Sequence, residues 1–298
     1  MKFGKLPHSE NINFKLQADQ FVAEKIFSGY QLQKTNMYVG CTIWGRSDLK
    51  HFYPRGIKDE LAYYGTQFDC IELNATFYNN FPMQTIETWC EKTPDTFKFF
   101  PKLHQSITHW KKLKDAKTST DIFLDSVAHF QDKLGMLFLQ LPESFGPDHW
   151  EILRNYLADW PSGFPLALEL RHPDWYNGRW DNSKLYHFME SKNITHVITD
   201  APGRRDLVHM RLTTPTAFIR FNGSTENQDF ARLDDWYKRL ALWTSLGIEN
   251  IYFFMHQNEE QPAPMMASYL IHKLNTGLNA HLKIPRLPAQ EQQLNLFE

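Results

Sequence analysis

Eight short segments rich in β-branched and aromatic residues recur along the chain, and most gaps between them carry a helical pattern of apolar positions. The segments are YVGCTIW (38–44), FDCIELN (68–74), FKFFPK (97–102), GMLFLQL (135–141), PLALELR (165–171), THVITD (195–200), TAFIRF (216–221) and NIYFFM (250–255). Short runs of this kind are typical of β-strands. The gaps repeat apolar residues at helical spacing, as in residues 85–94, 119–134 and 234–247. Alternating strands and helices favour a parallel sheet, and eight such units predict a closed TIM-type (β/α)8 barrel.

The pattern also predicts how the chain is divided. No linker rich in Gly, Ser or Pro interrupts residues 37–281, so we expect these residues to form one barrel domain. Residues 1–36 form a polar extension, in which the amphipathic stretch QFVAEKIF (20–27) predicts a helix over the bottom or the side of the barrel. Residues 282–298 are predicted to be a flexible tail. The gap between the sixth and seventh strands is too short for a full helix, which makes it the weakest point of the repeat.

Polar side chains gather where the predicted strands end. In a (β/α)8 barrel the C-terminal ends of the strands converge on one face, where the chemistry takes place. Residues two apart in a strand share a face, so Glu72 and Asn74 are expected to point to the barrel axis, away from Ile71 and Leu73. The strand-end residues that predict a ligand pocket are Glu72, Asn74, Lys102, Gln140, Glu169, Arg171, His172, Asp200, Arg220 and Asn222.

These polar residues have a purely structural alternative. Barrel interiors also contain charge pairs that only neutralise each other, and Glu169 with Arg171 fits that description. Burying many ionisable groups in one layer costs free energy, however, and this favours a pocket with a function.

Several of these segments together resemble the YecE-like family, also called domain of unknown function 72. The resemblance rests on IELNATFY (71–78), LGMLFLQLPESF (134–145), LALELRHPDWY (166–176) and VITDAPG (197–203), and it extends from about residue 38 to residue 272. It implies a TIM-type barrel with a polar pocket at its C-terminal face and no established activity. The chain departs from the family pattern in two places. It reads Arg220-Phe-Asn222-Gly223 where members have R-x-H-G, and FFMHQN (253–258) where they have YFNN.

The strand-end residues favour an enzyme with an anionic, phosphate-bearing substrate, and a sugar comes next. Glu72 and Glu169 are the acid–base candidates, which would suit a hydrolase or a lyase. His172 and Asp200 are expected to carry protons or to bind a metal together with His256, although no short metal-ligand spacing such as HExxH supports a metal. No nucleotide-cofactor motif occurs. The anion-binding candidates are Lys102, Arg171 and Arg220, and Asn74, Thr76, Tyr78, Gln140, Trp175 and Asn222 are expected to line the pocket.

The composition of the chain limits which kinds of partner we expect it to have. With 32 basic and 34 acidic residues among 298, the chain has no strong electrostatic field for nucleic acid. The lysine-rich stretch 102–117 has the pattern of a solvated loop more than of a nucleic-acid site. The three cysteines, Cys41, Cys70 and Cys90, show no CxxC spacing, which favours reduced thiols. The N-terminus lacks a secretory pattern and no apolar run is long enough to span a bilayer, so we expect a cytoplasmic protein.

The end of the chain carries a separate motif. Gln293, Leu294, Leu296 and Phe297 form the sequence QLNLF, which resembles the short peptide by which bacterial DNA polymerases and repair proteins dock on the DNA sliding clamp. This motif supports an alternative function, that of a non-catalytic adaptor in DNA replication or repair. A tail that packs on its own barrel is an equally good interpretation.

Overall fold

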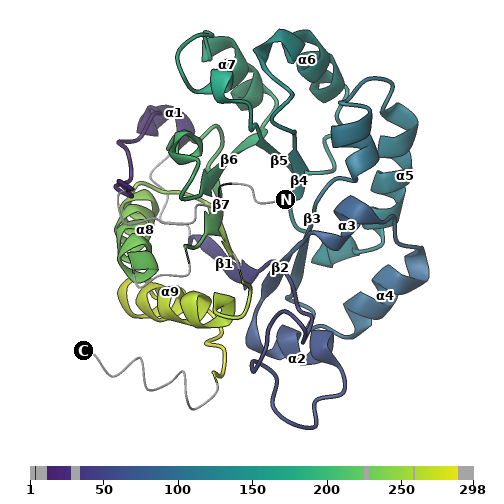
Figure 1. Cartoon of the computed structure of the whole chain (residues 1–298), viewed down its shortest axis with the longest axis vertical. Helices are drawn as coiled ribbons and strands as arrows, with labels where there is room; N and C mark the ends of the chain where they lie inside the picture. The colour runs from purple at the N-terminus through teal and green to yellow at the C-terminus, as the bar shows by residue number, and fades with distance from the viewer. Residues whose placement is uncertain (1–3, 5–11, 28–33, 225–227, 258, 288–298) are drawn as a thin grey trace.

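The chain folds into a barrel of eight parallel strands surrounded by helices (Figure 1). This computed structural model describes residues 4, 12–27, 34–224, 228–257 and 259–287. The strands are β1 (Asn36–Cys41), β2 (Cys70–Leu73), β3 (Lys98–Pro101), β4 (Leu137–Gln140), β5 (Leu166–Glu169), β6 (Thr195–Asp200), β7 (Thr216–Asn222) and β8 (Asn250–His256). Their order is β3-β2-β1-β8-β7-β6-β5-β4, and parallel bridges between Phe99 and Leu134 and between Lys102 and Phe138 close β3 onto β4. The predicted TIM-type barrel is confirmed.

Helices of very different lengths connect the strands. The α-helices are α1 (Ala23–Ile26), α2 (Glu60–Gln67), α3 (Ala75–Tyr78), α4 (Met83–Glu91), α5 (Lys117–Ala128), α6 (Trp150–Ala158), α7 (Ser183–Ser191), α8 (Gln228–Ser245) and α9 (Ala263–Leu278). Short turns of 3-10 or π type are η1 (Ser106–Trp110), η2 (Gln131–Lys133), η3 (Pro147–His149), η4 (Pro173–Trp175) and η5 (Arg205–Leu207). None of the helices in these ranges is long and apolar enough to cross a membrane.

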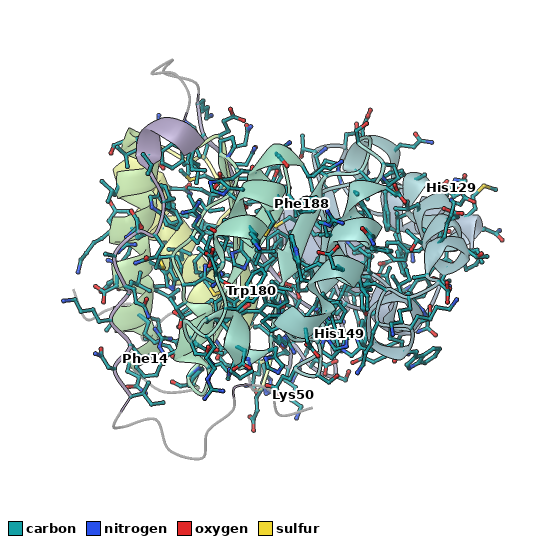
Figure 2. All side chains as sticks on the ribbon, turned by 90° about the horizontal axis from the view of Figure 1, so that it is seen from above. Phe14, Lys50, His129, His149, Trp180 and Phe188 are labelled. Atoms are coloured by element: carbon teal, nitrogen blue, oxygen red, sulfur yellow. The ribbon has the colours of Figure 1, made fainter. Side chains whose placement is uncertain are left out.

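The N-terminal extension covers the place where the repeat is incomplete. Between β6 and β7 the described chain has only the turn η5. Residues 12–27 pass beside it, where the backbone N–H of Gln20 donates to the carbonyl of Met210. The residue before Gln20, Asp19, accepts from the indole of Trp243 on α8 at 3.1 Å. The segment around Phe14 therefore lies along the side of the barrel, as Figure 2 shows, and the predicted helix at 20–27 is reduced to the single turn α1.

The start of the predicted tail is packed rather than free. The backbone N–H of Arg286 donates to Gln67 at the end of α2, and Lys283 forms an ion pair with Asp69 at 2.7 Å. Leu282 and Leu287 are buried. The domain boundaries at residues 36 and 281 stay predictions, but residues up to 287 are held against the barrel.

Apolar side chains on the two faces of the strands form two separate layers. The larger layer lies between the sheet and the helices and includes Ile71, Leu73 and Leu168. The smaller layer fills the barrel interior, where Phe100 and Phe254 have ring centroids 5.0 Å apart and Phe138 and Phe218 5.5 Å apart. The predicted alternation of faces therefore holds, and an aromatic floor closes the barrel below the C-terminal strand ends.

A glycine on the inner face of β1 allows β1 and β2 to approach each other closely. A Cβ atom on Gly40 would lie 2.4 Å from the carbonyl oxygen of Cys70 and 2.8 Å from its Sγ. Because a backbone atom of β2 cannot move away, we expect Gly40→Ala to lower the free energy of unfolding by about 1–3 kcal/mol. Urea denaturation measures this. The matched control is Gly163→Ala, since a Cβ there meets nothing within 4 Å; equal effects for both variants would contradict the packing argument.

Candidate functional site

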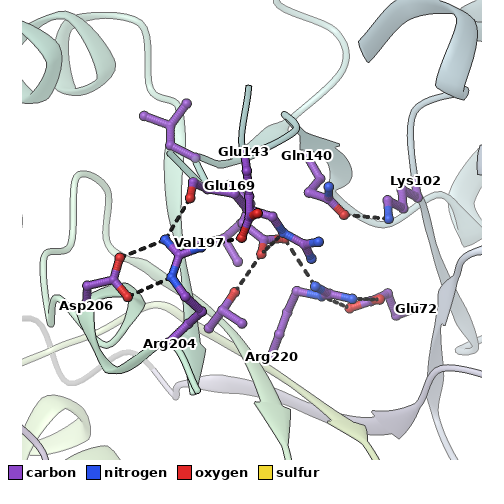
Figure 3. Close-up of polar contacts among 12 residues, drawn as sticks. Glu72, Lys102, Gln140, Glu143, Glu169, Val197, Arg204, Asp206 and Arg220 are labelled. Atoms are coloured by element: carbon purple, nitrogen blue, oxygen red, sulfur yellow. Dashed lines mark hydrogen bonds and ion pairs between the residues drawn. The ribbon is translucent and has the colours of Figure 1, made fainter. Parts of the chain in front are cut away.

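The strand register brings one layer of polar side chains onto the aromatic floor. Gln140 of β4 lies beside Glu169 of β5, and Thr199 of β6 lies beside Arg220 of β7. Lys102 follows β3 directly and bridges to Phe138 of β4. We call Glu72, Asn74, Lys102, Gln140, Glu169, Arg171, Thr199 and Arg220 the mouth cluster. Figure 3 shows its labelled members converging from different strands.

Arg220 is the centre of the mouth cluster. Its Nε and one terminal nitrogen donate to both oxygens of Glu72, at 2.8 and 2.9 Å, and the other terminal nitrogen donates to Glu169 at 3.1 Å. The guanidinium lies 4.7 Å from the ring centre of Phe138. Such bidentate pairing fixes a carboxylate in one orientation. One buried arginine thus holds two carboxylates that are far apart in the sequence.

The two carboxylates are held in their ionised form. Glu169 also accepts from Nε of Arg171 at 2.9 Å and from the hydroxyl of Thr199 at 3.1 Å. Burial by itself would raise the pKa of Glu169, but the charges of Arg171 and Arg220 outweigh it and lower this pKa to about 2. Burial likewise opposes ionisation of Glu72, and Arg220 again lowers the pKa. Neither carboxyl group can therefore act as a general acid near neutral pH.

Lys102 is the group of the mouth cluster that can change its charge near neutral pH. Its Nζ donates to Oε1 of Gln140 at 2.7 Å and lies 4.3 Å from the ring centre of Phe77. Within the described residues, no carboxylate lies at ion-pair distance from Nζ. Burial, followed by the positive charges of Arg220 and Arg171, lowers the pKa of Lys102 to about 7.

One residue of the lysine-rich loop joins the rim of the cluster. The ring of His109, on η1, meets the ring of Phe77 edge-on at 4.8 Å. Burial, followed by the charges of Lys102 and Arg171, lowers the pKa of His109 to about 4, so its imidazole is neutral at pH 7. The lysines Lys111 and Lys117 of the same loop bond to Asp115 and Asp121 in solvent.

Asp200 lies apart from the mouth cluster, on the outer face of β6. It pairs with Arg205 and with Arg232, the latter at 2.8 Å, and accepts from the indole of Trp236 at 2.7 Å. These partners come from η5 and α8, on the helix side of the sheet. The geometry gives Asp200 a structural position between strand and helix rather than one facing a ligand.

Three other predicted pocket residues do not belong to the mouth cluster, and each has its own backbone partner. Trp175 is fully buried and donates to the carbonyl of Phe145, so its ring cannot stack on a sugar. His172 accepts from the backbone N–H of Asp174. Thr76 donates to the carbonyls of Leu73 and Lys102, and through the second bond it holds the backbone of Lys102.

Two predicted residues lie at the margin of the site. Tyr78 is 64% exposed, on the rim beyond Thr76. Asn222 ends β7, where its carbonyl accepts from Arg232, and its buried side-chain Oδ1 has no hydrogen-bond partner among the described residues.

The part of the chain that the structure describes contains no group of His, Cys, Asp or Glu residues arranged to hold a metal ion. His256, a candidate ligand, pairs with Glu260 instead. Gln293, Leu294, Leu296 and Phe297 lie outside the described residues, so clamp binding through them stays a prediction.

Sequence reasoning missed three contributors to the mouth cluster. Thr199 was overlooked in favour of Asp200, although strict alternation from Val197 points Thr199 to the axis. Phe77 and Phe138 do not stand among the sequence candidates, yet their rings contact the charged groups of Lys102 and Arg220. No local pattern marks an aromatic ring as the neighbour of a lysine.

Fold and site together define a TIM-type barrel with a buried charged cluster at the C-terminal ends of its strands. A family model described as "Protein of unknown function DUF72" matches residues 38–292, and the chain belongs to this family. The UPF0759 protein YecE of Escherichia coli K12 is 27% identical over 88% of this chain and all of its own length. The UPF0759 protein YunF of Bacillus subtilis is 29% identical over 56% of this chain and 61% of its own. The family resemblance read from the sequence is confirmed.

Solved structures of the same family have the same fold. The DUF72 family protein of Thermotoga maritima superposes with a TM-score of 0.61 at 27% identity and covers 80% of this chain and 99% of its own. The DUF72 family protein of Enterococcus faecalis superposes with a TM-score of 0.64 at 19% identity and covers 80% of this chain and 95% of its own.

Proposed function

We propose that the chain is an enzyme that binds a small anionic substrate at the mouth cluster, with Lys102 as the group that changes its protonation. The observation that carries the proposal is a lysine buried at the C-terminal ends of the barrel strands without a carboxylate partner among the described residues. A buried ammonium in such a place is stabilised by an anion that arrives as a ligand.

The charges of the cluster support an anionic ligand. Glu72 and Glu169 are balanced by Arg220 and Arg171, so a protonated Lys102 adds a positive charge that no described carboxylate neutralises. Lys102 and Arg171 are each 8% exposed, which suits a small ligand and not an oligosaccharide. With both carboxylates held ionised, acid–base chemistry near neutral pH falls to Lys102.

The proposal makes the affinity for anions dependent on pH. A bound anion raises the pKa of Lys102 above its free value of about 7, so below that value Lys102 is already charged and the affinity is constant. Above it, binding must take up a proton, and the affinity is expected to fall by up to about tenfold per pH unit. The charged groups that face Lys102 are Arg220, Arg171, Glu169 and Glu72, and all of them keep their charge across this range.

Isothermal titration calorimetry with pyruvate, whose carboxylate keeps its charge near pH 7, measures this directly in buffers of different ionisation heat, and inorganic phosphate is used for the affinity alone. Near pH 7 we expect an uptake of about half a proton per pyruvate bound. Lys102→Met should weaken binding by about tenfold to a hundredfold and remove the proton uptake. Lys111→Met, in the same loop but in solvent, is the matched control and should bind normally. If neither anion binds, or if Lys102→Met binds like the native protein, the proposal is wrong.

A further inference from the structure

We propose that Lys102 is a nucleophile that forms a Schiff base with the carbonyl group of a small α-keto acid. This inference rests on the proposed function, because it names the substrate class and the reactive atom of the same site. It comes from the surroundings of Nζ, which are the surroundings that make a lysine amine reactive.

A lysine attacks a carbonyl only when its amine has lost its proton. Burial and nearby cations are the two features that favour the neutral amine. Lys102 has both, because it is 8% exposed, lies between the rings of Phe77 and Phe138, and feels the charges of Arg220 and Arg171. Its pKa of about 7 leaves about half of the amine neutral at pH 7. In an ordinary exposed lysine that fraction is lower by about a thousandfold.

The amine is also fixed in position. The carbonyl of Lys102 accepts from the hydroxyl of Thr76 at 2.8 Å, and Nζ donates one hydrogen to Gln140 at 2.7 Å. A neutral amine that donates one hydrogen to an amide oxygen keeps its lone pair for another partner. The half-buried His109 packs edge-on against the same Phe77 ring, and its imidazole is neutral at pH 7, so it adds no charge beside the amine.

Charge balance selects a keto acid among carbonyl compounds. When the amine is neutral, Arg220 and Arg171 balance Glu72 and Glu169, and the cluster has no net charge. A Schiff base on Lys102 carries a positive charge, which would be unbalanced in this buried place. The carboxylate of a keto acid brings the missing negative charge next to the new cation, whereas a simple ketone or aldehyde does not.

The covalent step balances in atoms and electrons. The lone pair of Nζ forms a bond to the carbonyl carbon, and the C=O π pair moves to the oxygen, which takes up a proton. The nitrogen then releases a proton, which gives a neutral carbinolamine. Protonation of its hydroxyl lets the oxygen leave as water, and the nitrogen lone pair closes the C=N bond of the iminium ion. The step needs no oxidant or reductant.

The test traps this iminium ion in the full-length protein. The protein is incubated at about pH 7 with pyruvate and sodium cyanoborohydride, which reduces the C=N bond to a stable secondary amine, and labelled peptides are mapped by mass spectrometry. We expect one adduct, on Lys102, formed faster than on any exposed lysine. Acetone in place of pyruvate should label Lys102 at least about tenfold more slowly.

Variants keep the result interpretable. Lys102→Met and Lys102→Arg should each lose the adduct while their thermal unfolding shows that the barrel is folded. Lys111→Met should be labelled like the native protein. If the native protein binds pyruvate with proton uptake but yields no adduct on Lys102, the inference is overturned and the anion site stands. If pyruvate and phosphate fail to bind and no adduct forms, the proposed function fails together with the inference.

Discussion

Replacing Arg220 with Met is expected to lower the free energy of unfolding by about 3–5 kcal/mol, because removing one partner of a buried ion pair leaves the other charge without compensation. In this protein the substitution removes an ion-pair partner from two carboxylates. Arg220 donates to both oxygens of Glu72 and to one oxygen of Glu169, and both carboxylates are buried below 2% exposure. Arg171 and Thr199 still bond to Glu169, so Glu72 loses most, and Asn74 is its remaining hydrogen-bond partner among the described residues.

The effect of this variant depends on pH in a defined direction. In the native protein the folded pKa of Glu169 is about 2, below its ordinary value of about 4.3. Its contribution to stability is therefore present above about pH 4.3 and lost as the pH falls through about 2. In Arg220→Met, burial without Arg220 raises the pKa of Glu72, so this variant gains stability as the pH falls. The difference between the two proteins should shrink from pH 7 to about pH 5.

Urea denaturation followed by circular dichroism measures both effects. The matched control is Lys117→Met, which breaks an ion pair in solvent and should change stability little. The double variant Glu72→Gln with Arg220→Met should recover part of the lost stability, since it removes the stranded carboxylate. An Arg220→Met protein as stable as the control would show that the mouth cluster does not hold the barrel together.

The position of this network could be predicted from the sequence, but its pairing could not. The alternation of Cys70, Glu72 and Asn74 with Ile71 and Leu73 places Glu72 on the inner face, and this is what the structure has. The partner of Glu72 lies 148 residues further along the chain. The predicted barrel gives the order of the strands, but which inward side chains meet across the axis also depends on the stagger between strands and on side-chain length, and local spacing records neither.

Asp200 points outward to the helices, although its place at the end of a strand segment makes it a catalytic candidate in the sequence. Alternation is the stronger constraint: Val197 belongs to the inner apolar layer and Thr199 bonds to Glu169, so Asp200 must point outward to the helices. Its partner Arg232 lies on α8, and a sequence pattern gives no sign of that contact.

The proposed acid–base role falls to Lys102 and not to the carboxylates for a similar reason. From the sequence, Glu72 and Glu169 are the obvious acid–base pair and Lys102 an anion binder. Each carboxylate is bonded to Arg220. Against the effect of burial, Arg171 and Arg220 lower the pKa of Glu169 and Arg220 lowers that of Glu72, whereas burial, followed by the charges of Arg220 and Arg171, lowers the pKa of Lys102. A pKa depends on which charges meet in three dimensions and on how deeply they are buried, and residue types alone do not fix either.

Arg232→Met is the variant that separates the outer network from the mouth cluster. Arg232 is 3% exposed and pairs with Asp200 at 2.8 Å and with Asp229 at 2.6 Å. Its guanidinium also lies 4.5 Å from the ring centre of Phe14, and a terminal nitrogen donates to the carbonyl of Asn222. Removing it takes one ion-pair partner from a buried carboxylate on the strand and from another on the helix, so we expect a loss of about 3–5 kcal/mol in the free energy of unfolding.

What makes this variant informative is that anion binding should survive. Asp200 faces α8 and not Lys102, so the affinity for phosphate or pyruvate in the folded Arg232→Met protein should stay within about twofold of the native value. Urea denaturation gives the stability and calorimetry below the unfolding range gives the affinity. Arg154→Met, which breaks an ion pair with Glu151 on the surface of α6, is the control. Should Arg232→Met lose anion binding while it remains folded, the outer network would belong to the site, and Asp200 would return to the catalytic candidates.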